Sequence, residues 1–324
     1  MMLTPKSLIS LMATLLPERY PNKDFFIADI LDAAPKADVG SMEHPIFSLS
    51  KKPDHSIRRY EHGDISVEIQ PSVKGNANIW DKDVLIYCCS QLREGLNRGR
   101  EPSPVIHIRA HDLLVATNKK IIGGGDYRNL MESLERLAGT RIKTNIATGD
   151  KTERYNFGLI VQYKVLEETR GGKDRMASIA IEIPSWLFRA VVSGEVLTLD
   201  RNYFRLRGGI ERRLYELARK HVGNQPKWVI GMDLLHKKSG SQSKLKSFRY
   251  QVIKLAKSNH LPGYKLKYNS DKDQLMFFNR KGVKAAKAEF DEAIKEIYQP
   301  LSAKHPRKKA PKRKNSNQRE LSLD

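Results

Sequence analysis

The spacing of apolar residues predicts an α+β chain in which one series of elements occurs twice. The first series is a helix over 81–98, a strand over 105–108, a short helix at Asp112, a helix over 127–138, and strand patterns over 142–146 and 155–165. The second is a helix over 209–221, a strand over 228–230, a short helix at Asp233, a helix over 243–259, and a hairpin of strands 264–268 and 275–278.

The two series agree in register as well as in order. Asp112-Leu113-Leu114 and Asp233-Leu234-Leu235 lie 121 residues apart, and the same shift carries Tyr127-Arg128 onto Phe248-Arg249. Helix, strand, helix, turn, helix and hairpin is the order of a winged helix-turn-helix. We therefore expect two tandem winged-helix domains, over 46–183 and 184–298.

The two ends of the chain are expected to stand apart from these domains. Residues 1–45 are predicted to form an arm with a helix from Pro5 to Leu16 and a short helix over 25–33. Two strands, over 46–51 and 65–69, are expected to follow the arm. Residues 299–324 are basic and poor in large apolar side chains, so we expect a disordered tail. The first apolar run is too short to span a bilayer and has no cleavage signal, which predicts a cytoplasmic protein without membrane contact.

The charge is concentrated in two segments. The chain has a formal net charge of +21. Residues 201–282 contribute +15 and residues 301–324 contribute +6, so the remainder is close to neutral. A basic surface confined to one region favours a docking face for a polyanion, and nucleic acid is the usual partner.

The helix over 243–259 carries the strongest candidate site. With Phe248, Val252 and Leu255 directed inward, its opposite face is cationic and no acid interrupts it. The candidate DNA-binding residues there are Lys244, Lys246, Arg249, Tyr250, Lys254 and Lys257. A solvated surface helix normally mixes Glu with Lys, so this pattern favours entry into a major groove over a merely solvated face.

Two further groups are weaker candidates. In the hairpin, Lys265, Lys267 and Lys272 would form a wing that reaches phosphates or the minor groove; a soluble loop is the alternative. In the first series, Arg128, Asn129, Ser133 and Arg136 occupy the matching helix face with Glu132 and Glu135 nearby. That mixed face is equally compatible with ordinary solvation, so the second domain is expected to supply most of the affinity.

No catalytic, metal or cofactor site is expected. Gly171-Gly172-Lys173 lacks the upstream glycine and the Ser/Thr of a phosphate-binding loop. His107 and His111 fall across a strand-to-helix junction and would not share a face for a metal. The adjacent Cys88 and Cys89 lie in an apolar run and are expected to be core thiols.

Several longer motifs resemble the replication initiator protein A family of bacterial plasmid replication proteins. They are Met42–Leu49, Arg58-Arg59-Tyr60-Glu61, Trp80–Asp83, Ile86-Tyr87-Cys88, Asn97–Arg100, Asp112–Asn118 and Gly139–Ile142. The stretch from Ile183 to Phe278 is also similar to the C-terminal winged helix of iteron-binding Rep proteins. Together the resemblance covers about residues 40–280.

The resemblance implies a function that the repeat alone does not. Such proteins bind directly repeated origin sites in double-stranded DNA, help to melt an adjacent segment, and recruit the host initiator and replicative helicase. They commonly exchange between monomers on the repeats and dimers on their own operator, and they cut no bond. A transcriptional repressor at an operator and a nicking enzyme are the alternatives.

Overall fold

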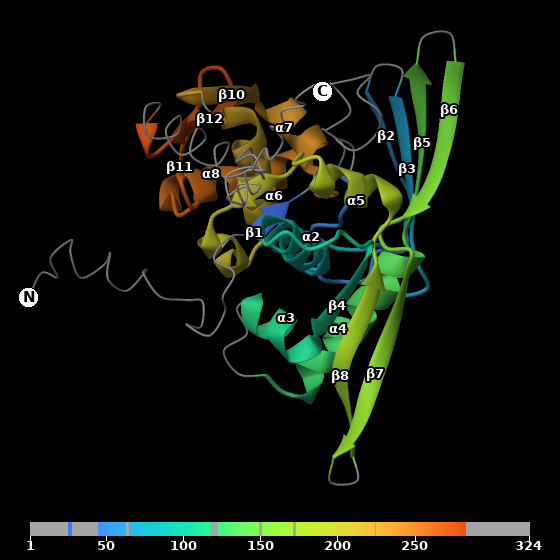
Figure 1. Cartoon of the computed structure of the whole chain (residues 1–324). Helices are drawn as coiled ribbons and strands as arrows, with labels where there is room; N and C mark the ends of the chain where they lie inside the picture. The colour runs from blue at the N-terminus through green and yellow to red at the C-terminus, as the bar shows by residue number, and fades with distance from the viewer. Residues whose placement is uncertain are drawn as a thin grey trace, which may run out of the picture.

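The structure, a computed structural model, describes residues 25–27, 45–62, 65–117, 122–148, 151–170, 173–223 and 225–282 (Figure 1). The expected arm helix at Pro5–Leu16 and the basic tail over 299–324 lie outside these residues. Within the described ranges, no helix has the length and apolar character needed to cross a membrane.

The first copy of the repeat combines three helices with a three-stranded sheet. Its elements are α2 (Lys82–Asn97), β4 (Val105–Arg109), α3 (Ala110–Ala116), α4 (Gly124–Gly139), β7 (Gln162–Arg170) and β8 (Lys173–Glu182). The strands pair antiparallel in the order β4-β8-β7. Ile106 and Ile108 of β4 are buried and alternate with exposed His107 and Arg109, as expected of a strand with one face on the core.

The second copy repeats this arrangement. Its elements are α6 (Gly209–Val222), β10 (Lys227–Gly231), α7 (Met232–Ser239), α8 (Leu245–Ser258), β11 (Tyr264–Asn269) and β12 (Gln274–Asn279). The strand order β10-β12-β11 matches that of the first sheet. Helices α4 and α8 begin at Gly124 and Leu245, 121 positions apart, so the internal repeat predicted from the sequence is confirmed.

An inserted hairpin distinguishes the first copy. Strands β5 (Arg141–Thr148) and β6 (Lys151–Gly158) extend β2 (Arg58–His62) and β3 (Ile65–Gln70) into a four-stranded sheet of order β2-β3-β5-β6. The hairpins β5–β6 and β7–β8 point to opposite ends of the molecule (Figure 1). The single strand expected over 155–165 is therefore wrong: the chain leaves one sheet after Gly158 and enters the other at Gln162.

Two expectations near the start of the chain are also wrong. Residues 25–27, expected to begin a helix, form strand β1 (Phe25–Ile27), which pairs with β9 (Leu197–Leu199). Residues 46–51, expected to be a strand, form an irregular loop in which only Ser48 makes a β-bridge. The hydroxyls of Ser48 and Ser50 accept hydrogen bonds from the backbone two residues on, and such local bonds compete with a strand ladder.

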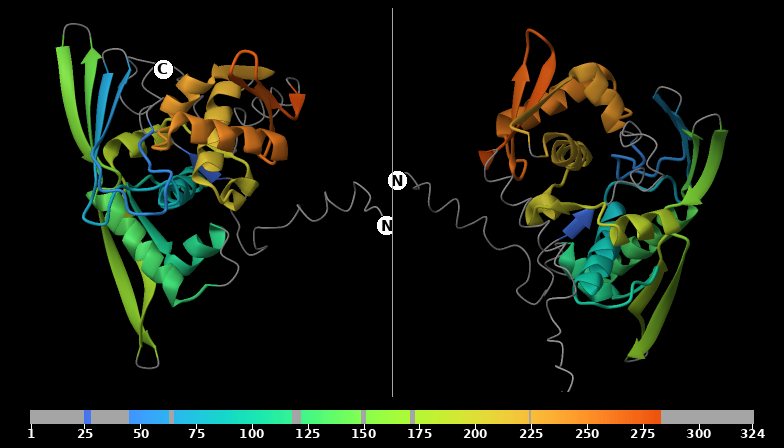
Figure 2. Two further views of the ribbon diagram at one scale, coloured as in Figure 1. Left: turned by 180° about the vertical axis from the view of Figure 1, so that it is seen from behind. Right: turned by 45° about the horizontal axis from the view of Figure 1, so that its top comes forward.

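The connection between the copies packs on the first one. Helix α5 (Ser185–Val192) contacts α2, and the 3-10 helix η2 (Arg201–Arg205) leads into α6. Figure 2 shows from two sides how the second copy, in yellow to orange-red, lies beside α2 and the first copy. Both cysteines are buried in the core on α2, as expected.

Buried ion pairs join the two copies. Lys82 Nζ lies 3.1 Å from Glu216 Oε2, and Arg212 Nη1 donates to Asp83 Oδ1 at 2.6 Å, so α2 is linked twice to α6. The hydroxyl of Tyr203 donates to Glu216 at 2.8 Å. Burial disfavours the ionised form of Glu216, but the neighbouring cations and this hydroxyl outweigh it and lower its pKa. Each of these buried charges has a partner of opposite sign, and the two ion pairs join α2 of the first copy to α6 of the second.

Candidate nucleic-acid interface

Helix α8 presents a basic face to solvent. Phe248 and Val252 are fully buried, whereas Leu245 and Leu255 are partly buried. Asn259, with a left-handed φ of 50°, ends the helix. The exposed side consists of Lys244, Lys246, Tyr250, Lys254 and Lys257, and Tyr250 is 70% exposed. The helix contains no acid, and within the described part of the chain none of these lysines forms an ion pair, so their charges are available to a ligand.

Arg249 does not belong to this free face. Its Nε donates to Asp273 Oδ1 at 2.9 Å and its Nη2 donates to Oδ2 at 2.7 Å. The Tyr268 hydroxyl donates to the same carboxylate at 2.7 Å. The Arg249 guanidinium and this hydroxyl lower the pKa of Asp273, while the carboxylate raises the pKa of Arg249. The bidentate pair ties α8 to the turn of the β11–β12 hairpin, so Arg249 positions the hairpin rather than offering a free cation.

The hairpin lysines lie on a different surface from the helix. Lys265 and Lys267 are exposed and alternate with buried Tyr264 and Leu266. They therefore occupy the outer face of the sheet, opposite the face that packs on the core. All three hairpin lysines are exposed, and their expected role as a wing that reaches phosphates or the minor groove stays a prediction.

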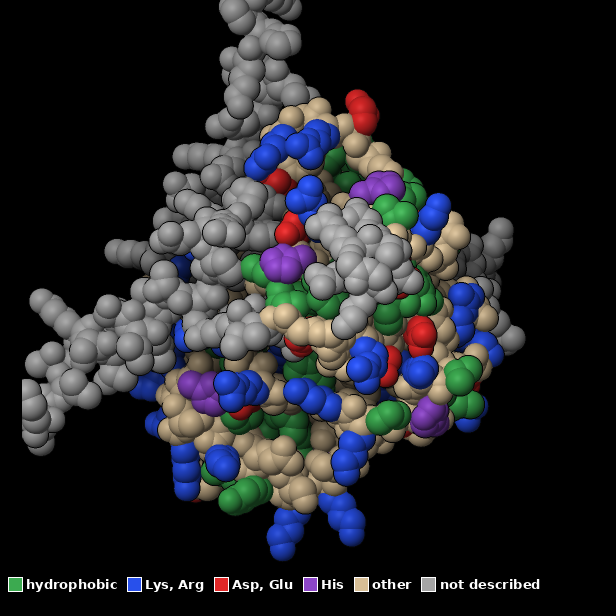
Figure 3. Space-filling view, turned by 90° about the horizontal axis from the view of Figure 1, so that it is seen from below, with side chains coloured by type: hydrophobic (Ala, Val, Ile, Leu, Met, Phe, Trp, Pro, Cys, Tyr) green, Lys and Arg blue, Asp and Glu red, His purple; other side chains and the backbone are tan. Residues whose placement is uncertain are grey.

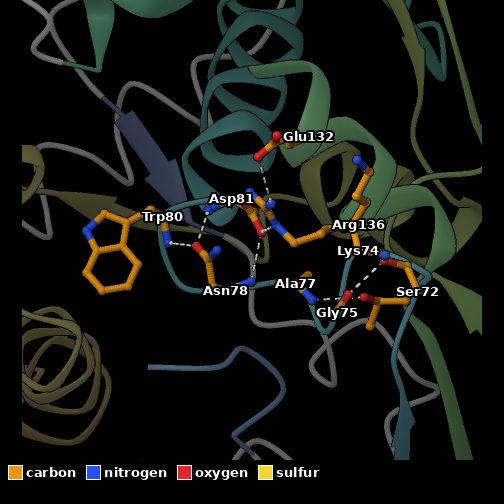
Figure 4. A network of polar contacts seen from close by, with 10 residues as sticks. Ser72, Lys74, Gly75, Ala77, Asn78, Trp80, Asp81, Glu132 and Arg136 are labelled. Atoms are coloured by element: carbon orange, nitrogen blue, oxygen red, sulfur yellow. Dashed lines mark hydrogen bonds and ion pairs between the residues drawn. The ribbon is translucent and has the colours of Figure 1, made fainter. Parts of the chain in front are cut away.

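The matching helix of the first copy is partly covered. Arg128 and Asn129 are exposed near the start of α4. Ser133 is buried, contrary to the expectation that it lies on the outer face. Arg136 is also different from expectation: its side chain is only 15% exposed and donates to both oxygens of Asp81 at 2.7 Å (Figure 4). The Asp81 contact strengthens the protonated form and raises the pKa of Arg136.

The segment that covers α4 is the connection from β3 to α2. Figure 4 shows Ser72, Lys74, Asn78 and Asp81 of this segment beside Arg136 and Glu132 of α4. Asp81 Oδ2 also accepts from the backbone of Asn78 at 2.8 Å, and Lys74 Nζ lies 3.8 Å from Glu135. Hydrogen bonds within the connection and ion pairs to α4 hold the two together.

Figure 3 shows one face of the molecule, on which the basic residues are scattered. On the face seen from below in Figure 3, Lys and Arg side chains stand at separated points, with acidic side chains between some of them. Among the described residues, no group of three His, Cys, Asp or Glu side chains could hold a metal ion. The continuous, acid-free face of α8 is therefore the candidate interface that the described structure supports best.

The sequence predicted helix α8, but it did not reveal the acids that pair with two candidate arginines, Arg249 of α8 and Arg136 of α4. Asp273 lies in the hairpin turn, 24 residues after Arg249, and Asp81 lies 55 residues before Arg136. The first partner could have been suspected, because the hairpin was predicted to follow the helix directly. The second depends on how the connection from β3 to α2 folds back, for which the local spacing gives no signal.

These observations define a class of protein: a two-unit α+β protein whose second unit exposes a candidate nucleic-acid-binding helix. Comparison with known proteins gives the family. The family model described as replication initiator protein A matches residues 36–266, and the chain belongs to this family. The expected resemblance is thereby confirmed.

Two similar proteins extend this result. A protein of Wigglesworthia glossinidia brevipalpis that is named as a candidate replication protein is 41% identical over 261 residues, which cover 80% of this chain and 94% of that protein. The crystal structure of domains 2 and 3 of RctB matches with a TM-score of 0.57 and 13% identity, covering 77% of this chain and 97% of that one. At this identity, the second likeness concerns the fold alone. Family membership and the first relative support a role in the initiation of replication.

Proposed function

We propose that this protein is a plasmid replication initiator that binds repeated origin sites in duplex DNA. The observation that carries the proposal is the face of α8, where Lys244, Lys246, Lys254 and Lys257 are exposed, without ion pairs in the described structure and without an acid on the helix. A major groove admits an α-helix, and lysines supply contacts to phosphates and to guanine edges. Tyr250 is exposed on the same face and would contact a base or sugar.

We interpret each repeat unit as a winged helix. In both, two helices follow the first strand, and a two-stranded hairpin completes a three-stranded sheet with the same strand order. In the second unit, α8 would be the recognition helix and β11–β12 the wing, held against the helix by the pair Arg249–Asp273. Fixing these two elements relative to each other before DNA arrives lowers the ordering cost of binding.

The first unit is assigned a smaller share of the affinity. Of its four candidate residues, Arg128 and Asn129 are exposed, whereas Ser133 and Arg136 are engaged in the fold. We therefore expect the first unit to contribute weak DNA contacts or a protein interface. For its partners, we propose that the protein recruits the host initiator and helicase and exchanges between monomer and dimer. We also propose that it is cytoplasmic and cuts no bond. These proposals depend on family membership.

The proposal is tested by binding of the full chain to duplexes from its own replicon. Fluorescence anisotropy should show tighter binding to a repeat-containing duplex than to a scrambled one. If six to ten phosphates are neutralised, affinity should fall roughly 10³–10⁵-fold between about 50 and 200 mM salt. Binding that does not respond to salt would contradict the proposal.

DNase I footprinting separates initiation from repression. Protection of an array of direct repeats supports origin binding, whereas protection of a single palindrome alone supports a transcriptional repressor. Incubation with supercoiled origin DNA and Mg²⁺ tests the third alternative. Relaxed circles would show that the protein nicks DNA and would overturn the proposal that it cuts no bond.

A further inference from the structure

A cleft runs along one flank of α8, outside the residues assigned above except for Lys254. It has a volume of about 870 Å³ and lies between the loop over 48–56, the start of α6, the α7–α8 turn and α8 itself. Most of the side chains that line it are polar. They include Lys52, Asp54, Ser56, Glu211, Lys254 and His260.

The loop that forms one wall is held in a defined position. Its residue Ser48 pairs with the connection from β3 to α2, where Ser48 N donates to Ala77 O at 2.9 Å. Asn76 donates its backbone N–H to Asp54 O at 2.7 Å and its side-chain amide to Ser56 O at 2.8 Å. The wall is therefore built by the first copy, and it reaches across to the helix of the second.

Close packing fixes the opposite wall against this loop. A Cβ atom on Gly209, at the start of α6, would lie 2.2 Å from Leu49 O, so only glycine permits this approach. Gly240, in the α7–α8 turn, has a φ of +71° and would bring a Cβ atom to 2.4 Å from Pro45 Cβ. The cleft is thus a fixed gap between two tightly joined segments.

The acids of the cleft are already engaged by the protein. Asp54 accepts hydrogen bonds from the backbone and hydroxyl of Ser56 and lies 3.7 Å from the buried Arg58. Burial opposes ionisation of Asp54, but these contacts outweigh it and lower its pKa. Glu211 accepts from the backbone of Gly208 at 2.9 Å and lies 3.3 Å from His260 Nε2. In the described structure neither carboxylate forms an ion pair with a lysine of the cleft: Asp54 is paired with Arg58, and Glu211 keeps its negative charge.

Two lysines line the cleft, one on each wall. Lys52 on the loop and Lys254 on α8 are both exposed, and neither has an ion-pair partner among the residues that the structure describes. The hydroxyl of Ser243 and the side-chain amide of Gln251 also line the cleft. Two opposed ammonium groups with neutral hydrogen-bond donors in the same cleft suit a phosphodiester backbone, which is anionic and rich in acceptor oxygens.

We propose that this cleft binds the sugar-phosphate backbone of one strand of the duplex whose major groove α8 enters. The inference depends on the proposed function, because Lys254 belongs to both surfaces and makes them continuous. In this arrangement the first copy contacts DNA through Lys52, in addition to the contacts made by the recognition helix of the second copy. Because this contact involves the DNA backbone and not the bases, it adds affinity without sequence preference.

The test compares three single variants of the full chain in anisotropy titrations. Lys52→Ala removes the cleft cation that belongs to the loop, Lys246→Ala removes a cation of α8 that does not line the cleft, and Lys227→Ala removes an exposed cation from the sheet of the second copy. Lys52→Ala should weaken binding about fivefold to specific and scrambled duplexes alike and lower the salt slope by about one. Lys227→Ala should stay within about twofold of the wild type.

The outcomes separate the two proposals. If the wild-type chain binds no duplex, the proposed function fails. If it binds, Lys246→Ala weakens binding, and Lys52→Ala behaves as Lys227→Ala does, the cleft inference fails while the proposed function stands. Titration with thymidine 5′-monophosphate tests a small-ligand site: saturable binding that Lys52→Ala abolishes, with DNA affinity unchanged, would also overturn the inference.

Discussion

Helices α4 and α8 occupy the same place in the two copies of the repeat, yet their outer faces differ. Ser133 of α4 is buried, whereas Lys254, 121 positions later, is exposed. Arg136 is bound by Asp81, whereas its equivalent Lys257 is exposed without an ion pair in the described structure. The connection from β3 to α2 covers α4. The same helical pattern therefore serves packing in one copy and leaves an exposed basic face in the other.

The largest effect that tests this comparison concerns stability. Arg136→Ala leaves the buried carboxylate of Asp81 without its cation and should lower the free energy of unfolding by about 3 kcal/mol. Lys257→Ala, the equivalent change in α8, should alter it by less than about 0.5 kcal/mol. Urea denaturation measures both. Equal effects would mean that the Arg136–Asp81 pair does not hold α4 to its covering segment.

A double-mutant cycle identifies the contact responsible. Asp81→Asn combined with Arg136→Ala should cost less than the sum of the two single changes, because the second change no longer leaves a full buried charge. Strict additivity would assign the loss to the side chains separately and not to their interaction.

The second effect concerns DNA affinity. Lys246→Ala with Lys254→Ala should weaken binding by about 30-fold, equivalent to ~2 kcal/mol, because both cations are exposed on α8. Arg128→Ala with Asn129→Ala should cost less than about fivefold, because it removes one cation from a face that is largely covered.

A charge-matched control distinguishes a specific contribution of the α8 face from a general effect of the protein's net charge on DNA affinity. Lys265→Ala with Lys267→Ala also removes two charges, from the outer face of the hairpin sheet, and should cost less than about fivefold. If this pair costs as much as the pair on α8, the sheet face and not the helix is the main contact.

The sequence predicted the helices and the repeat better than the role of individual side chains. The spacing of apolar residues was sufficient to predict helices α6 and α8. In α8, for example, Phe248 and Val252 were expected on the core side and are buried. Strand β2, with the sequence Arg-Arg-Tyr-Glu-His, has no apolar alternation and was not predicted. Arg249 and Lys254 look equally suited to DNA in the sequence, and only the fold of the hairpin turn places Asp273 against the first of them.

The smallest effect tests how closely the covering segment approaches α4. Gly139 ends α4, and a Cβ atom there would lie 2.5 Å from Ser72 Cβ. The equivalent position in the second copy is His260, which is exposed and needs no such small residue. Gly139→Ala should therefore destabilise the protein by about 1 kcal/mol, since the crowding outweighs the gain in helix propensity.

A compensating change decides whether crowding is the cause. Ser72→Gly removes the Cβ atom that the new methyl group would meet at 2.5 Å and leaves the Ser72 Cα at 3.3 Å, so Gly139→Ala should become close to neutral in that background. Thermal or urea denaturation of the two single variants and the double variant measures this. If Gly139→Ala is stabilising in the wild-type background, the segment has room to move away from α4. The difference between the two copies would then come from the ion pairs and not from tight packing.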